Sequence, residues 1–262
     1  MTHAAESAHW YTDTGQVAYE VPNGSKGGMR PTTLRDARKL GLVPSVTGII
    51  RCADRPALTT WLVEQGIMAA LTLPRAVDEP EKAWLARVRN DAKEQARKAS
   101  ERGTAIHAAI QGHYEGTPPS EEFWPHVQGA TKAVCEWAAD QTWYAEASFA
   151  HVLGYGGKVD LHSDAFVLDF KTKEFDETGM EGLKAWDEHA MQLAAYREGL
   201  AIPNGARCGI CYVSVNNPGL ARVIEIPEAA LSRGWDMFLG LLSYWKALKK
   251  FDPAFERIKR AA

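Results

Sequence analysis

Two carboxylates and a lysine share one face of a predicted β-hairpin between residues 157 and 171. The segment reads GKVDLHSDAFVLDFK, with polar and apolar residues alternating on both sides of Ser163-Asp164. Successive side chains of a strand point to opposite faces, so a two-residue turn at Ser163-Asp164 puts Asp160, Asp169 and Lys171 on one face. In this register Asp160 is diagonal to Asp169, close enough for the two carboxylates to share a cation. A lysine beside them suits metal-assisted hydrolysis of a phosphodiester.

This register also predicts the pairing of the two strands. Asp160 is expected opposite Val167, and Lys158 opposite Asp169. The other face then carries only apolar side chains, which predicts that it packs into the core: Val159, Leu161, Phe166, Leu168 and Phe170. Any half-exposed antiparallel sheet shows the same alternation without chemistry. Other residues of the chain are therefore needed to distinguish a solvated face from an active site.

The composition is typical of a soluble globular protein of 262 residues, with 45% hydrophobic and 24% charged residues. The net charge of −3 excludes a uniformly basic nucleic-acid-binding surface but allows a local basic patch. We find no apolar run of membrane-spanning length and no N-terminal signal-peptide pattern. These features predict a cytoplasmic protein without a membrane partner.

The four cysteines are expected to be reduced, because the chain lacks export signals: Cys52, Cys135, Cys208 and Cys211. Cys208 and Cys211 have the two-residue spacing of metal ligands. However, residues 207–215 read as a buried strand, in which positions three apart face opposite sides. We therefore interpret this pair as core cysteines.

The remaining patterns indicate helical material followed by a mixed α/β core. A hairpin is expected around Asp13-Thr14-Gly15, within 10–21, and a loop over 23–28. We expect helices over 33–40, 45–71, 81–114, 121–140, 183–200 and 227–250. We expect strands over 143–152, 157–163, 165–171, 207–215 and 220–226.

Seven basic residues in the first part of the 81–114 helix have two interpretations: Lys82, Arg87, Arg89, Lys93, Arg97, Lys98 and Arg102. Interleaved with acids, such a run usually forms a solvated helix surface. The alternative is a stripe that faces phosphates.

Three further polar residues indicate a function only in combination with the predicted hairpin. His107 lies among small and apolar residues of a helix, where a histidine is more often a hydrogen-bonded core residue than a metal ligand. Gln192 and Tyr196 are four apart and so share a helix face. Both can bind phosphate oxygens or hold other side chains in place; a partly buried polar pair is the simpler alternative.

Four motifs in this order resemble the PD-(D/E)XK nucleases of the RecB-like branch. They are Gly-Thr-x-x-His at 103–107, Gly-x-x-Asp at 157–160, Asp-x-Lys at 169–171 and Gln-x-x-x-Tyr at 192–196. That branch includes the mitochondrial genome maintenance exonuclease, whose Pro-Ser-Val-Thr motif is similar to residues 44–47, and CRISPR-associated RecB-like exonucleases.

The resemblance covers about residues 44–226 and implies an α/β fold with a restriction-endonuclease-like mixed central sheet flanked by helices and an N-terminal helical region. We expect a nuclease domain over 44–250, mainly helical at 44–140 and with its sheet core at 141–250. Residues 1–43 form an extension without assignment, and 251–262 a tail.

The same resemblance implies a role for each site residue. It makes His107, Asp160, Asp169 and the backbone carbonyl of Phe170 ligands of Mg²⁺ or Mn²⁺. It makes Lys171 the group that positions the attacking water. It assigns DNA contacts and support of the site to Gln192 and Tyr196. It assigns a contribution at a second metal to Glu146. Many relatives hold an iron–sulfur cluster with three cysteines near the C-terminus, and no cysteine follows Cys211, so no Fe–S cluster is expected.

Together these inferences predict a Mg²⁺- or Mn²⁺-dependent DNA exonuclease in recombination, repair or phage DNA metabolism. Helices between 45 and 115 are long enough to roof the site, which favours single-stranded DNA or other DNA with free ends as substrate. Three alternatives remain open. The chain can be an endonuclease of the same fold, a nucleic-acid-binding module without catalysis, or an α/β interaction protein.

Overall fold

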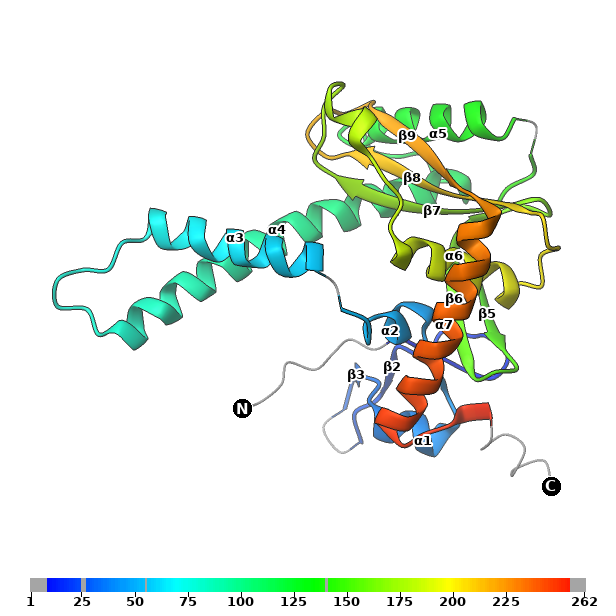
Figure 1. The fold of residues 1–262 in the computed structure, drawn as a ribbon, viewed down its shortest axis with the longest axis horizontal. Coiled ribbons are helices and arrows are strands. Elements are labelled where there is room, and N and C mark those ends of the chain that lie inside the picture. The colour runs from blue at the N-terminus through cyan, green and yellow to red at the C-terminus, as the bar shows by residue number, and fades with distance from the viewer. Residues whose placement is uncertain (1–8, 25–26, 55, 140, 255–262) are drawn as a thin grey trace.

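A five-stranded mixed sheet forms the centre of the fold (Figure 1). The computed structural model describes residues 9–24, 27–54, 56–139 and 141–254. The strands follow the order of the chain across the sheet: β5 (Tyr144–His151), β6 (Tyr155–His162), β7 (Phe166–Lys173), β8 (Arg207–Ser214) and β9 (Ala221–Ile226). Neighbours are antiparallel except β7 and β8, which are parallel because α6 (Asp187–Gly199) connects them. The predicted mixed sheet flanked by helices is confirmed.

Both faces of the sheet are covered, so two hydrophobic clusters form. One lies against α4 (Glu81–Tyr114) and α5 (Trp124–Trp137) and contains Ile106, Ile110, Leu168 and Cys211. The other lies against α2 (Val46–Ile50), α6 and α7 (Glu228–Lys249) and contains Cys208. The two cysteines are thus fully buried on opposite sides of β8, as expected.

The residues before the sheet form short elements that lie against the second cluster. β1 (Trp10–Tyr11) pairs with β4 (Val43–Pro44), and β2 (Glu20–Pro22) pairs with β3 (Met29–Pro31). Helix α1 (Leu34–Leu40) begins at the capping residue Thr33 and ends at Gly41, whose φ of 74° favours glycine. The predicted 10–21 hairpin is reduced to a single bridge between Tyr11 and Val17. Of the 251–262 tail, residues 255–262 lie outside the described part of the chain.

Most predicted elements are found within a few residues of their expected ends. The exception in arrangement is the helical region between 45 and 115. It divides into α2, α3 (Pro56–Thr72) and α4, and α3 runs alongside the first half of α4 as an arm that projects from the body (Figure 1). The predicted roof over the site does not include α3, which packs on α4, whereas α2 packs on β6 and the later part of α4 packs on β5 and β7.

The predicted turn of the central hairpin is also displaced. The N–H of Ser163 donates to the carbonyl of Phe166, so Asp164 and Ala165 form the two-residue turn. The observed pairs are Leu161–Leu168 and His162–Val167. The register is therefore two residues away from the predicted one. An even shift keeps the paired residues on their predicted faces: Leu161, Leu168 and Phe170 are buried together in the first cluster, and Phe166 is half-buried. Val159 is buried in the second cluster, so the predicted common face is wrong for this residue, which lies beyond the last β6–β7 pair, Leu161–Leu168.

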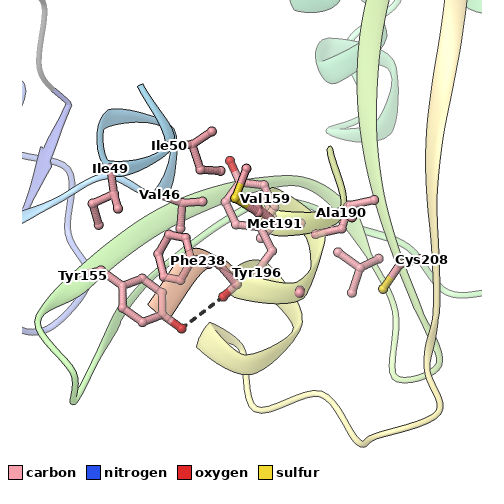
Figure 2. Packing of buried hydrophobic residues seen from close by; sticks show 14 of the residues in the cluster. Val46, Ile49, Ile50, Tyr155, Val159, Ala190, Met191, Tyr196, Cys208 and Phe238 are labelled. Atoms are coloured by element: carbon pink, nitrogen blue, oxygen red, sulfur yellow. Dashed lines mark hydrogen bonds between the residues drawn. The ribbon is translucent and has the colours of Figure 1, made fainter. Parts of the chain in front are cut away.

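Helices α6 and α7 approach closely at Gly234. A Cβ placed there would lie 2.6 Å from the backbone carbon of Ala190 and 2.9 Å from the nitrogen of Met191. Figure 2 shows Ala190, Met191 and Tyr196 of α6 packed with Phe238 of α7 in the second cluster. Because α6 also carries Gln192, the missing side chain of Gly234 sets the position of a predicted site helix.

We expect Gly234→Ala to destabilise the protein by about 1–3 kcal/mol, the usual cost of overpacking a core. Gly240→Ala on the same helix is the matched control, since a Cβ there meets no atom within 4 Å. Alanine's higher helix propensity should make this control about 0.5–1 kcal/mol more stable than the wild type. Urea unfolding of both variants measures the difference, and equal stabilities would contradict the close approach.

Candidate active site

One carboxylate oxygen of Asp160 joins three elements. Oδ2 accepts a hydrogen bond from the backbone N–H of Phe170 on β7, 2.8 Å away. The same oxygen accepts a second hydrogen bond from Nε2 of His107 on α4, at 2.9 Å. The backbone pairing of β6 with β7 ends at Leu161–Leu168, immediately next to Asp160. The Asp160 carboxylate therefore accepts the N–H of Phe170 and lies between the sheet and α4.

Glu146 lies on the other side of Asp160, on β5. The pairs Ala145–Leu161 and Ala147–Val159 flank it, so Glu146 stands opposite Asp160. Its φ of 57° is left-handed, a conformation that costs a non-glycine residue on the order of 1–3 kcal/mol. The carboxylate forms an ion pair with Lys158 of β6. A strained residue at this position is a structural sign of function that the sequence pattern did not contain.

His107, Glu146 and Asp160 form a group that can hold a metal ion. One ligand atom from each lies within 4.8 Å of the others. The group offers two carboxylates and one imidazole. Carboxylate oxygens suit Mg²⁺, and the imidazole nitrogen makes Mn²⁺ equally acceptable. The donor set therefore fits the divalent ion expected from the sequence.

Asp169 is not in that group of three but lies beside it in a buried pocket. Only 2% of the residue is exposed. Oδ1 accepts a hydrogen bond from Nε2 of Gln192 at 2.6 Å, and Oδ2 forms an ion pair with Nζ of Lys171 at 2.5 Å. The Gln192 amide also donates to the hydroxyl of Tyr196, 3.0 Å away. Gln192 and Tyr196 thus hold Asp169 from α6.

The charges of the site are strongly coupled. Burial raises the pKa of Asp169 to about 6, with the Asp160 charge adding to the shift and Lys171 opposing it. Burial also acts to raise the pKa of Asp160, but the hydrogen bond and charge of His107 outweigh it and the pKa falls below its usual value. For His107 and Lys171, burial lowers the pKa, yet the neighbouring carboxylates raise both pKa values above their ordinary ones. The carboxylates of this compact site are thus neutralised by the neighbouring cations.

Helix α4 reaches β7 because residue 103 is a glycine. A Cβ at Gly103 would lie 2.5 Å from Oγ1 of Thr172. One turn later on α4, His107 reaches Asp160. An open hollow of about 610 Å³ lies where helix and strand meet, lined by Ser100, Gly103, Thr104, His107, Phe170, Lys171 and Thr172. A substrate can approach His107 and Lys171 from this side.

The structure brings all the predicted site residues into one neighbourhood and adds contacts that the sequence pattern did not reveal. The N–H of Phe170 is bound to Asp160, while its carbonyl stays a predicted ligand. The pairing of Glu146 with Lys158 and the contact of Gly103 with Thr172 were not foreseen. Lys158 is two residues before Asp160 on β6 and so shares its strand face, which was the available signal for Lys158.

The basic run of α4 is at least partly paired within the chain. Arg87 binds Glu79, Arg97 binds Glu94, and Arg102 binds Glu122, at 2.6–2.8 Å. Exposed pairs of this kind are typical of a solvated helix surface. The structure thus favours the simpler interpretation of this run for these three arginines.

No protein-family profile matches the sequence, and no curated protein matches it either. Among solved structures, a putative exonuclease from Eubacterium rectale is similar over 57% of this chain and 68% of its own, with 12% identity and a TM-score of 0.41. An alkaline exonuclease from Laribacter hongkongensis is similar over 78% of this chain and 98% of its own, with 13% identity and a TM-score of 0.35.

We expect Gly103→Ala to displace α4 from β7 and thereby separate His107 from Asp160. Loss of a group that orients a metal ligand usually weakens metal binding by about 10–100-fold. Calorimetric titration with Mn²⁺ measures this effect. The double variant Gly103→Ala/Thr172→Ala removes the hydroxyl in the way and should restore most of the affinity. A double variant as weak as Gly103→Ala would show that the close approach is not the cause.

Proposed function

We propose that this protein is a divalent-metal-dependent nuclease that hydrolyses phosphodiester bonds in DNA. One observation carries the proposal: an imidazole and two carboxylates converge on one position, directly beside a buried carboxylate–lysine pair. A structural ion-pair network rarely concentrates so many charges in one place, because each buried charge costs free energy. A metal site at which a phosphate is attacked accounts for both groups.

The first group would hold the ion. His107, Glu146 and Asp160 supply its ligands, and Asp169 with the carbonyl of Phe170 completes the set that the motif resemblance implies. A bound Mg²⁺ or Mn²⁺ supplies Lewis-acid polarisation of the phosphate and a lower pKa for bound water. Asp160 is fixed for this role by Phe170 and needs no rearrangement of the backbone.

The second group would act on the reacting atoms. Lys171 is about one-third exposed at the hollow, while its ammonium is fixed by Asp169. From there it can position the attacking water and offset charge that grows on the phosphate as the bond to the leaving oxygen breaks. Gln192 holds the Asp169 carboxylate and so fixes the direction of Lys171. Tyr196 supports Gln192, so its effect on catalysis is indirect.

The exonuclease form of the proposal rests on the motif resemblance. An endonuclease of the same fold is the second candidate, and a specific observation favours it. The hollow beside His107 and Lys171 is open, and the α3–α4 arm projects away from the sheet instead of covering it (Figure 1). An open site accepts a strand from the side as readily as from an end.

We expect Mg²⁺- or Mn²⁺-dependent release of nucleotides from end-labelled linear DNA, and none in EDTA. Asp169→Asn and Lys171→Ala should each lower turnover by about two orders of magnitude or more, the usual effect of losing one preorganised electrostatic group. Lys173→Ala is the matched control, since Lys173 is exposed on the same strand and should leave the rate unchanged. Near-normal cleavage by Lys171→Ala would reject the assignment.

Circular substrates separate the two candidates. The exonuclease predicts that covalently closed single-stranded and double-stranded circles survive while the linear forms are degraded. Degradation of circles at the linear rate would establish the endonuclease instead. Running single-stranded and double-stranded forms in parallel gives the strand preference in the same experiment.

We expect His107→Gln and Glu146→Gln each to weaken Mn²⁺ binding by at least about tenfold, because each removes or neutralises a ligand. His113→Gln, on the same helix, is the control and should bind normally. Calorimetric titration gives the affinities and melting curves report folding. If His107→Gln lowers the melting temperature while Mn²⁺ affinity stays unchanged, His107 is a structural residue and not a ligand.

A further inference from the structure

The arm formed by α3 and the first half of α4 exposes an unusual amount of apolar surface. Seven large side chains of α3 are between 37% and 71% exposed: Leu58, Trp61, Leu62, Val63, Ile67, Met68 and Leu71. Helix α3 buries only a narrow side against α4, at Ala69 and its neighbours. A helix that is apolar on nearly all sides is normally buried on nearly all sides. At about 100° per residue, Leu58 and Leu62 lie beside the buried Ala69, whereas Trp61, Val63, Ile67, Met68 and Leu71 lie on the remaining sides of the helix. These five side chains form the outer face of α3, which lacks its cover.

The charge distribution restricts what can cover this face. Helix α3 has one charged residue, Glu64, and no basic residue. A nucleic-acid backbone requires cations, and amphipathic membrane-surface helices are rich in lysine and arginine. The charges of the arm lie instead on α4 and its preceding loop, where Arg97 pairs with Glu94 and Arg87 with Glu79. A neutral apolar face of this kind is typical of interfaces between protein subunits.

The spacing of the exposed residues fits a second copy of the same helix. Val63, Ile67 and Leu71 recur every four residues and form one ridge along α3. Ridges of this spacing pack into each other when two helices cross. In an antiparallel crossing with a two-fold axis at Ile67, Ile67 meets its own copy and Val63 faces Leu71 of the other copy. The ridge is therefore complementary to itself, as a two-fold interface requires.

The apolar area is of the size that such an interface needs. The five side chains of the outer face are between 37% and 71% exposed; at about 150 Å² for a large side chain, they present roughly 400 Å² of apolar surface. A stable interface takes about 800 Å² from each partner, and a little more than half of that area is apolar. Monomeric proteins rarely leave a continuous apolar surface of several hundred Å² in water. Leu85 of α4 and Val77 of the connecting loop are 40% and 99% exposed and enlarge the apolar surface of the arm.

We propose that the outer face of α3 is a homodimer interface, in which two arms pair through their α3 helices with the charged faces of α4 outside. The nuclease sites then lie on the two bodies, away from the contact. This inference does not depend on the proposed function, because it concerns the arm and not the site.

Light scattering of the full-length protein at micromolar concentrations should give twice the mass of one chain. Ile67→Arg places two like charges together at the axis and should weaken the dimer at least about thirtyfold, the effect of losing one central anchor residue. Leu71→Arg tests the neighbouring position in case the first variant does not fold. Lys93→Glu on α4 should remain dimeric. Circular dichroism must be unchanged, since Ile67 is 55% exposed in the single chain.

Cross-linking tests the predicted two-fold axis directly. In a Cys135→Ser background, Ile67→Cys should be joined to its own copy by a short thiol cross-linker, and Lys93→Cys should not. A monomeric mass at tens of micromolar overturns the proposal. So does a dimer that Ile67→Arg leaves intact, or a mass increase that occurs only when DNA is added.

Discussion

The site depends on one carboxylate oxygen. Oδ2 of Asp160 accepts the N–H of Phe170 and Nε2 of His107, so a single atom links β6, β7 and α4. In a continuous ladder, the N–H groups of β7 that face β6 would bond to backbone carbonyls. The N–H of Phe170 instead donates to the Asp160 carboxylate, which holds that side chain between the sheet and α4. Glu146, with its left-handed backbone, stands opposite Asp160 on β5.

Helix α4 serves two purposes along its 34 residues. Its C-terminal part packs on the sheet, and Gly103 allows the contact with Thr172 that brings His107 to Asp160. Its N-terminal part leaves the body and supports α3 (Figure 1). The proposed nuclease site and the proposed dimer interface thus share one rigid element, although the residues that form them are different.

On the side of α6, the site requires a charged group in a buried position, which is unfavourable for stability. Asp169 is nearly inaccessible to water, and burial of its charge is unfavourable. Gln192 and Lys171 compensate through direct contacts. Those contacts require α6 to be held firmly, which the tight approach of α7 at Gly234 provides. The core behind the site therefore has a direct part in preparing it.

The sequence by itself determined the features that depend on local periodicity. Alternation predicted that Leu161, Leu168 and Phe170 share an apolar face even though the register is displaced by two, because the strand period is two. It also separated Cys208 from Cys211. Tertiary structure alone decided the strand register, the left-handed backbone of Glu146 and the direction of the α3–α4 arm. These depend on contacts between residues distant in the sequence, and no local pattern records which of several sterically allowed partners a helix or strand will meet.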